Sequence, residues 1–281
     1  MIHIATVHWQ DESWIDVQLG YLKRNITEPF RVYAWLNGVP GDHRHKFHYV
    51  NTERVQAHAT KLNILADLIY FDSDRSDDLI IFLDGDAFPI GDVIGFAREK
   101  LREYPLIAVQ RLENNGDLQP HPCFCLTTVG FWKRIGGDWN LGYEWEDPQG
   151  KPMSDVGGNL LGILRREKLD WYPLRRTNRV NLHPLWFGIY AGQIYHHGAA
   201  FRAPLSRIDL RRVAEEARGT WRWQIAAIIN WLTPPGRLGR GLQRLNPVRA
   251  LENRAVQGNR KLNARVFSSL RNDPEFYREF D

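Results

Sequence analysis

The feature that most constrains the fold of this chain is an uninterrupted apolar run, from Leu79 to Leu83, between polar flanks. A run in which every residue is apolar is typical of a strand buried on both faces, as in a parallel sheet covered by helices. Asp84-Gly85-Asp86 follows it directly. The sequence therefore places two carboxylates at the carboxyl end of a buried strand, where open α/β sheets bind their ligands.

The two carboxylates at the strand end predict a cation site. Acidic side chains this close repel each other unless a positive charge lies between them, and a divalent cation is the usual solution. Gly85 lets the backbone turn, so that Asp84 and Asp86 can converge. The alternative is a solvated turn at a strand end, and the position directly after a buried strand favours the cation site.

Strands and helices alternate through the first two thirds of the chain. Strands are predicted at residues 2–7, 30–36, 47–50, 79–83, 106–109, 123–128, 171–172, 187–190 and 193–196. Helices are predicted at 15–22, 55–70, 92–104 capped by Asp92, 129–135, and to about 168 from a cap at Ser154 or Asp155. This alternation predicts an α/β fold with a mostly parallel central sheet flanked by helices.

Strand signals end near Leu205, and the remaining sequence is predicted to be helical at 208–217, 221–232 and 248–267. Residues 202–281 hold 16 Lys and Arg against 8 Asp and Glu, so the last quarter is basic. We therefore predict one domain over residues 1–205 and a basic helical C-terminal extension over 206–281. Such a charge asymmetry suggests an anionic partner for the extension.

Five segments of residues 1–205 carry a resemblance through their order along the chain: 58–63, the Asp-x-Asp motif 84–86, 122–139, 155–161 and His196-His197-Gly198. Together they resemble the GT-A-fold glycosyltransferases, which move a sugar from a nucleotide diphosphate donor to an acceptor. The resemblance implies a GT-A catalytic domain, with a Rossmann-like sheet, over residues 1–205.

The resemblance also implies how a metal would be held. Asp86 would bind the cation directly, and Asp84 would contact the ribose or a metal-bound water. One histidine of the pair His196 and His197 would complete the site, and we favour His196. Neutral imidazole is a fair ligand for Mn²⁺ and a poorer one for Mg²⁺, so either ion is expected as cofactor. The alternative for each histidine is a hydrogen-bonded residue at a strand end.

The remaining site residues are implied in the same way. The first strand and its loop, with Thr6, His8 and Trp9, would hold the base and ribose. Lys61 and Arg202 would contact the diphosphate, although Lys61 is almost equally well explained as a solvated helix charge. Asp155 is the candidate general base, and its alternative role is the helix N-cap. Its neighbours resemble elements of both inverting and retaining enzymes, so the stereochemical outcome stays open.

The predicted function is therefore metal-dependent transfer from a nucleotide diphosphate sugar, with a UDP-sugar favoured by family frequency, to a glycan or other hydroxyl acceptor. One alternative is a sugar-phosphate nucleotidyltransferase, but the loop at His8 to Asp11 lacks the glycine-rich sequence of those enzymes. The other alternative is a GT-A-like subunit without turnover that binds sugar or serves as a scaffold. The intact Asp84 and Asp86 pair argues against it.

The segment 221–232 mixes tryptophans with an apolar helix face, and Arg237, Arg240, Arg244 and Arg249 follow it. This pattern fits a helix at the surface of an anionic membrane and a lipid-linked acceptor. The alternative is a helix packed on the catalytic domain or on a second subunit. No signal pattern or membrane-spanning run is visible, so we expect a cytoplasmic protein or one peripheral on the inner face of the cell membrane. No nucleic-acid-binding signature is present, and no nucleic acid partner is expected.

Overall fold

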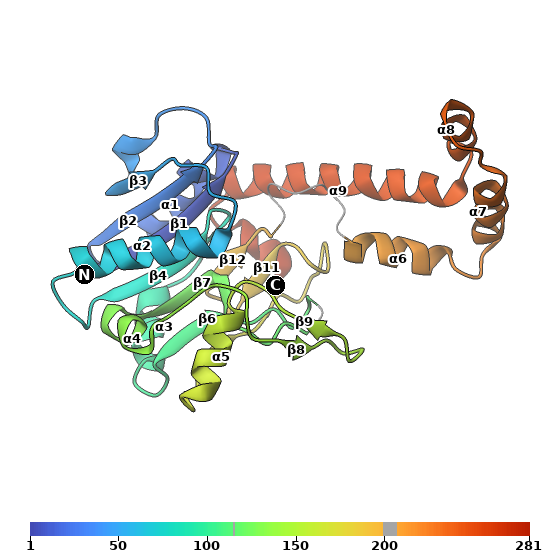
Figure 1. The fold of residues 1–281 in the computed structure, drawn as a ribbon. Coiled ribbons are helices and arrows are strands. Elements are labelled where there is room, and N and C mark those ends of the chain that lie inside the picture. Colours follow the sequence, from blue (N-terminus) through green and yellow to red (C-terminus); the bar gives the residue numbers. More distant parts are fainter. Residues whose placement is uncertain (115, 199–206) are drawn as a thin grey trace. The chain divides into compact units, whose positions relative to one another are not determined.

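The structure, a computed structural model, describes residues 1–114, 116–198 and 207–281. The chain forms two compact units (Figure 1). The first comprises Met1–Gly198 together with Pro274–Asp281, and the second comprises Ala199–Asp273. The boundary predicted at residue 205 lies outside the described residues. The C-terminal segment Pro274–Asp281, which was predicted as part of the extension, packs within the first unit.

A seven-stranded sheet forms the centre of the first unit. Its strands, in spatial order, are β10 (Tyr172–Leu174), β6 (Leu106–Val109), β7 (His121–Thr128), β4 (Leu79–Asp84), β1 (Ile2–Trp9), β2 (Phe30–Asn37) and β3 (Tyr49–Asn51). Neighbouring strands are parallel except where β7 pairs antiparallel with β4 and with β6. The predicted α/β fold with a mostly parallel sheet is therefore confirmed.

Two small antiparallel sheets complete the strands of the described residues. One contains β11 (Gly188–Tyr190), β12 (Ile194–His196) and β5 (Ala87–Pro89), and the other contains β8 (Trp145–Glu146) and β9 (Pro152–Met153). Strand β5 was not predicted, because three residues are too few to show a periodic pattern. Its pairing with β12 brings a late part of the sequence beside the turn that follows β4.

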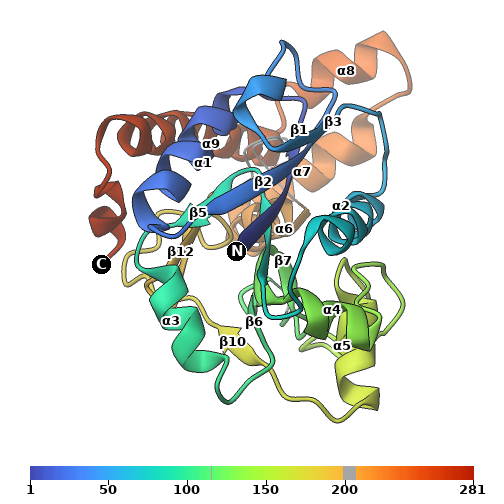
Figure 2. The same ribbon diagram turned by 90° about the vertical axis from the view of Figure 1, so that its left-hand side faces the viewer.

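Helices cover both faces of the central sheet. They are α1 (Ser13–Asn25), α2 (His58–Asp72), α3 (Val93–Lys100), α4 (Val129–Ile135) and α5 (Gly158–Arg166), with short 3₁₀ helices at Arg44–Lys46 and Phe276–Phe280. Figure 2 shows α1 and α3 on one face of the sheet and α2, α4 and α5 on the other. The sheet is therefore covered by helices on both faces, as the apolar run in β4 predicted.

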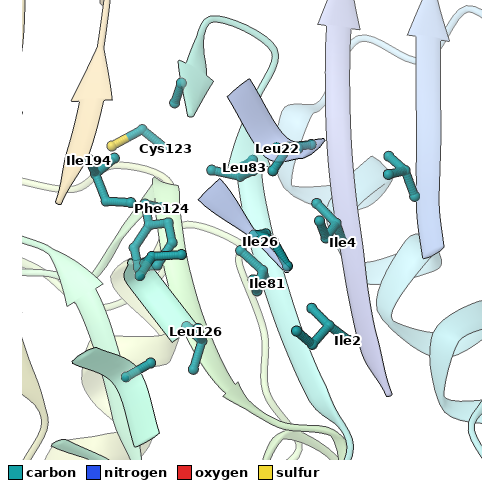
Figure 3. Close-up of a cluster of buried hydrophobic side chains, with 14 of the residues drawn as sticks. Ile2, Ile4, Leu22, Ile26, Ile81, Leu83, Cys123, Phe124, Leu126 and Ile194 are labelled. Atoms are coloured by element: carbon teal, nitrogen blue, oxygen red, sulfur yellow. The ribbon is translucent and has the colours of Figure 1, made fainter. Parts of the chain in front are cut away.

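The β4 run is apolar at every position because its two faces belong to two different cores. Ile81 and Leu83 pack with α1 and α3 in the cluster of Figure 3. Ile80 and Phe82 pack in the cluster formed with α2, α4 and α5. Full burial of a side chain of this size contributes about 1.5–3 kcal/mol, so β4 is firmly held below the turn that it carries.

The start of α5 differs from the prediction of a cap at Ser154 or Asp155. Gly157 precedes the first residue of α5, with a φ of +93°, and a Cβ there would lie 2.3 Å from the carbonyl oxygen of Pro120. Only glycine fits this left-handed and crowded position. The Asp155 carboxylate accepts a hydrogen bond from the Val156 N–H (2.8 Å) and does not cap the helix.

The end of α3 and the start of β3 also differ from the prediction, whereas the start of α3 agrees with it. Asp92 caps α3 as expected, accepting a hydrogen bond from the Gly95 N–H at 3.0 Å. The helix ends at Lys100, whereas the predicted end was near Tyr104. Strand β3 begins at Tyr49, because the preceding residues form a 3₁₀ turn that closes before the strand.

The second unit is helical in the part that the structure describes. It contains α6 (Arg207–Ala217), α7 (Trp221–Leu232), α8 (Arg237–Gln243) and α9 (Pro247–Asn272). The longest of these, α9, is started by Asn246, whose side-chain oxygen accepts the Val248 N–H at 3.0 Å. Among the residues described, no helix combines the length and the apolar character needed to cross a membrane.

Candidate metal and sugar-donor site

The Asp-x-Asp motif forms a tight turn at the carboxyl end of β4. Asp84 is the last residue of the strand and is half-buried, while Asp86 is buried. The Gly85 N–H donates to the Val7 carbonyl oxygen on β1 at 3.0 Å. A Cβ at Gly85 would lie 2.6 Å from Nδ1 of His8 and 2.9 Å from that carbonyl, so the position between the two aspartates admits only glycine.

His196 reaches this turn through the pairing of β12 with β5. In that antiparallel register His196 lies opposite Ala87, one residue after the motif. Its Nε2 lies 3.7 Å from Oδ2 of Asp84 and 3.6 Å from Oδ1 of Asp86. The three-residue pairing of β12 with β5 therefore brings His196 beside the Asp-x-Asp motif, although the two are far apart in the sequence.

The three side chains fit a divalent cation. One ligand atom each from Asp84, Asp86 and His196 lies within 4.8 Å of the other two. Bonds of about 2.1 Å to a central ion place neighbouring ligands roughly 3.0–3.5 Å apart, so a small inward movement completes the site. Two carboxylate oxygens and one imidazole nitrogen form a donor set suited to Mn²⁺ and acceptable to Mg²⁺.

His197, the other half of the predicted histidine pair, lies outside this group of three. Its ring packs 4.6 Å from the ring of Trp14 and 4.9 Å from that of Phe187, and its Nδ1 is 3.0 Å from the hydroxyl of Tyr195. Its backbone N–H donates to the carbonyl oxygen of Asp86 at 3.1 Å. The geometry therefore gives His197 a packing role and leaves His196 as the candidate ligand.

Hydrogen bonds and charges hold the two carboxylates in place. The Gly198 N–H donates to Oδ2 of Asp86 at 3.0 Å, so Oδ1 is the oxygen that faces His196. His58, the first residue of α2, has its Nε2 3.0 Å from Oδ1 of Asp84, without the alignment of a hydrogen bond. Burial would raise the pKa of Asp84, but His58 and His196 outweigh it and hold that pKa below its usual range.

Gln18 on α1 ties the first strand to the Asp-x-Asp turn. Its side-chain oxygen accepts hydrogen bonds from Thr6 (2.9 Å) and from His8 Nε2 (3.1 Å). Its amide nitrogen donates to the carbonyl oxygens of Asp84 and Ala87, both at 2.8 Å. A buried amide with every hydrogen-bonding group satisfied fixes its surroundings.

Thr6 and His8, both predicted to contact the donor, are wholly buried in this arrangement. Burial lowers the pKa of His8 to about 4, so its imidazole is neutral near pH 7. Their contact with Gln18 gives both residues a positioning role for the turn. Trp9, the third predicted residue of this strand, is partly exposed.

Lys61 on α2 lies on the β1 side of the motif. Its Nζ donates to the carbonyl oxygen of Val55 at 3.2 Å and sits 4.6 Å above the ring of Trp9. Burial lowers the pKa of Lys61 to about 8, and the nearby Asp84 opposes that shift. The ammonium group is therefore largely protonated at pH 7, and the alternative of a solvated helix charge is wrong because the side chain is buried.

A second polar group lies on the β6–β7 loop. Arg111 and His121 are buried, with Nη1 of the arginine 3.3 Å from Nε2 of the histidine, and the His121 ring is 5.9 Å from that of His196. Burial raises the pKa of Asp117 to about 6, and Asp155 contributes to that rise. The candidate general base Asp155 is therefore close to this loop.

Several residues of the site were missed in the sequence, and one predicted residue cannot be placed. His58 lies in the segment 58–63 that resembles the family, but it was not predicted as a site residue. Gln18, Arg111 and His121 stand alone in the sequence, so no spacing identified them. The signal available for Arg111 and His121 was their position, directly beyond β6 and at the start of β7. Arg202 lies outside the described residues.

The chain matches no family model, and no curated protein matches it. Among solved structures, it is similar to the mannosyltransferase PcManGT from Pyrobaculum calidifontis in complex with GDP-Man and Mn²⁺ (TM-score 0.42, 9% identity, 94% of this chain and 86% of that chain). It is similar to the catalytic domain of Drosophila β1,4-galactosyltransferase 7 in complex with xylobiose (TM-score 0.37, 13% identity, 70% of each chain).

A third similar structure is S. aureus TarS (TM-score 0.36, 10% identity, 50% of this chain). This chain covers 30% of TarS, less than a third of its length. Two of the three structures are named as sugar transferases. Because the identities and TM-scores are low, the function proposed below rests on the side chains of this chain.

Proposed function

We propose that this chain is a metal-dependent glycosyltransferase that moves a sugar from a nucleotide diphosphate donor to a hydroxyl acceptor. The observation that supports the proposal is the convergence of Asp84, Asp86 and His196. They meet at the carboxyl end of β4 near the middle of the sheet, which is the edge where open α/β folds bind ligands.

The atoms proposed as ligands of Mn²⁺ or Mg²⁺ are Oδ2 of Asp84, Oδ1 of Asp86 and Nε2 of His196. When bound, the cation would supply Lewis-acid stabilisation of the charge on the departing nucleotide diphosphate. His58 beside Oδ1 of Asp84 and the Gly198 N–H on Oδ2 of Asp86 orient the carboxylates toward each other. These second partners set the geometry of the ligands before the substrate arrives.

The nucleotide is proposed to lie on the β1 and α2 side of the cation site. Lys61, whose positive charge is buried next to Trp9, is suited to bind a phosphate oxygen. Trp9 offers a partly exposed aromatic face to the base or ribose. A UDP-sugar is the first donor to test, and a phosphate contact from Arg202 stays a prediction.

Asp155 is proposed as the general base that removes the proton of the acceptor hydroxyl. Its carboxylate is free of the helix-capping role, because Gly157 occupies the cap of α5. Gly157, two residues later, lies against the carbonyl oxygen of Pro120 at the end of the β6–β7 loop, and Asp155 contributes to the raised pKa of Asp117 in that loop. Both observations support a position for Asp155 beside this loop. The acceptor is therefore expected to approach from the β6 side.

Thermal unfolding with a nucleotide panel tests this function. We expect one of UDP, GDP, TDP or CMP to raise the midpoint by roughly 5–10 °C near saturation, and only with Mn²⁺ or Mg²⁺ present. The nucleotide is expected to bind the native state through the cation, and binding to the native state raises the midpoint of unfolding. The same nucleotide is then supplied as a panel of sugar donors, and release of the nucleoside diphosphate is measured.

A nucleotide response that is identical with the metal and with EDTA would contradict the metal site. Formation of pyrophosphate from a sugar phosphate and a nucleoside triphosphate would instead support a nucleotidyltransferase. Binding of sugar without turnover of any donor would support the scaffold alternative.

We infer that helices α7 and α8 bind an anionic membrane surface, which would give the enzyme access to a lipid-linked acceptor. Trp231 and Leu238 are 84% and 83% exposed. Further exposed apolar side chains on and around these helices are Trp221, Trp223, Ile225, Ile228, Leu232 and Leu245. The exposed residues Arg237, Arg240 and Arg244 lie among them. Exposed tryptophan and leucine beside arginine is the composition of a helix that lies in a lipid interface.

A double variant, Trp231→Ser with Leu238→Ser, tests this surface. We expect it to reduce co-sedimentation with phosphatidylglycerol vesicles about tenfold or more, because two exposed apolar anchors are removed. The control is Phe71→Ser, which removes an equally exposed side chain (80%) from the first unit. Equal sedimentation of both variants and the wild type, or equal binding to neutral phosphatidylcholine vesicles, would contradict the inference.

A further inference from the structure

The β6–β7 loop, residues 110–120, carries a buried cation, Arg111, that forms no ion pair among the described residues. The Arg111 side chain is 9% exposed, and among the described residues no carboxylate lies within 4.0 Å of its guanidinium. Its Nε is buried without a hydrogen-bond partner. Glu113 and Asp117 help to keep the guanidinium charged, but neither lies within ion-pair distance of it. A buried guanidinium with an unsatisfied N–H is suited to an anion supplied from outside the chain.

The contact between Arg111 and His121 also indicates that a hydrogen-bond acceptor is missing from this position. The Cys123 N–H donates to Nδ1 of His121 at 3.1 Å, so the ring hydrogen of His121 is on Nε2. That Nε2–H faces Nη1 of Arg111 at 3.3 Å. Two hydrogen-bond donors therefore face each other, and an acceptor that both can reach would satisfy them together.

Within the described part of the loop, the other charged side chains have hydrogen-bond partners of their own. Glu113 accepts a hydrogen bond from the hydroxyl of Tyr190 at 2.6 Å, and Asp117 accepts one from Asn114 at 2.7 Å. Gln119 is wholly buried, and neither its amide oxygen nor its amide nitrogen has a hydrogen-bond partner. Gln119 is thus a third side chain with an unsatisfied polar group, close in sequence to Arg111 and His121.

The sheet order places this group on one particular side of the cation site. Strand β6 runs parallel to β4, because both pair antiparallel with β7, so Arg111 and the Asp-x-Asp motif lie at the same edge. Lys61 and Trp9 lie on the opposite side, with β1 and α2. With the nucleotide against Lys61, as proposed above, the sugar and the acceptor beyond it would lie toward Arg111.

The geometry points to an oxyanion-binding subsite formed by Arg111 and Nε2–H of His121, which receives a carboxylate or phosphate group carried by the transferred sugar or by the acceptor. The inference rests on the proposed function for the direction in which the sugar points. It makes Arg111 a specificity-determining residue that selects a charged substrate over its neutral counterpart.

The test compares Arg111→Met with Arg102→Met, which removes an exposed arginine from the turn after α3. Donors of one nucleotide are supplied in pairs, a hexuronate and the matching neutral hexose, and acceptor glycosides are paired in the same way. We expect Arg111→Met to lower kcat/KM for the charged member of one pair by about 10- to 100-fold and for its neutral partner by less than about threefold. A selective loss in the donor pair assigns the charge to the transferred sugar, and one in the acceptor pair assigns it to the acceptor.

Thermal unfolding with small anions tests the same subsite without requiring turnover. We expect about 10 mM inorganic phosphate or sodium glucuronate to raise the thermal midpoint of the wild type and of Arg111→Lys by about 2 °C or more. Arg111→Met should show no such rise, and its own midpoint without anions should be at least that of the wild type, because an unpaired buried charge has been removed.

Equal loss of activity on charged and neutral substrates would overturn the subsite. Loss of the metal-dependent UDP or GDP response in Arg111→Met would overturn it too, since the bound anion would then be the diphosphate. An Asp86→Asn variant, tested in parallel, reports on the proposed function itself. If that variant keeps full turnover, the proposed metal site is contradicted, and the anion subsite is still judged by the Arg111→Met results.

Discussion

Replacing Asp86 with asparagine is expected to abolish metal-dependent turnover. The asparagine keeps the size of the side chain and can still accept the Gly198 N–H, but it removes the negative charge from the oxygen that faces His196. Loss of partners that only support metal ligands typically costs 10- to 100-fold in affinity or activity, so we expect loss of a ligand to lower kcat/KM by about 100-fold or more. Donor turnover and the paramagnetic resonance signal of free Mn²⁺ measure the two effects.

The matched control for this variant is Asp77→Asn. Asp77 lies just before the opposite end of the same strand, where it pairs with Arg75 on the surface at 2.7 Å. An exposed pair of this kind contributes at most about 1 kcal/mol, so turnover should be unchanged. The assignment of the cation site would fail if Asp86→Asn bound Mn²⁺ as tightly as Asp77→Asn in the presence of nucleotide.

The strand that carries the motif could be predicted because its physical cause is local. Five apolar residues in a row have to be buried on both faces, and the structure divides them between two cores. The position of the two carboxylates follows from the end of that strand. The same reasoning identified the parallel strands β1, β2 and β6, whose apolar periodicity is contained in a few residues.

The companions of the motif show no local pattern that identifies them, because each comes from a distant part of the chain. His58 is an ordinary first residue of a helix until α2 packs beside β4. Gln18 is one polar residue in an amphipathic helix, and only tertiary packing brings it between Thr6 and Asp84. His196 was accessible to prediction only through the order of motifs, since strand β5, which positions it, is too short to be recognised.

The cap of α5 shows why a local rule failed. Ser154 and Asp155 are favoured N-cap residues, and Gly157 is usually read as a weaker one. The carbonyl oxygen of Pro120 leaves no space for a Cβ at Gly157, so a contact from another loop fixes the start of the helix. The consequence for the site is that the carboxylate of Asp155 is directed elsewhere.

The largest expected effect on stability comes from the last residues of the chain, because the C-terminal segment packs into the first unit. Phe280 is fully buried beside the rings of Phe187 and Tyr195, and its carbonyl oxygen accepts the backbone N–H groups of Arg179 (2.7 Å) and Val180 (2.9 Å). We expect Phe280→Ala to lower the free energy of unfolding by about 3–5 kcal/mol, as is typical for a large aromatic residue removed from a core. Equilibrium unfolding in urea measures it.

The same variant is also expected to weaken Mn²⁺ binding, because the C-terminal segment supports the strands that carry the site. Phe276 packs against Tyr195 on β12 (4.8 Å) and Phe88 on β5 (6.4 Å), the two strands that position His196 beside Asp86. Arg278→Ala is the control, since Arg278 is exposed and forms a surface ion pair with Glu275, whose loss should cost less than about 1 kcal/mol. A Phe280→Ala protein as stable as Arg278→Ala would show that the segment is dispensable. A chain ending at Asn272 would then fold and bind metal, whereas we expect it to do neither, because it lacks both buried phenylalanines.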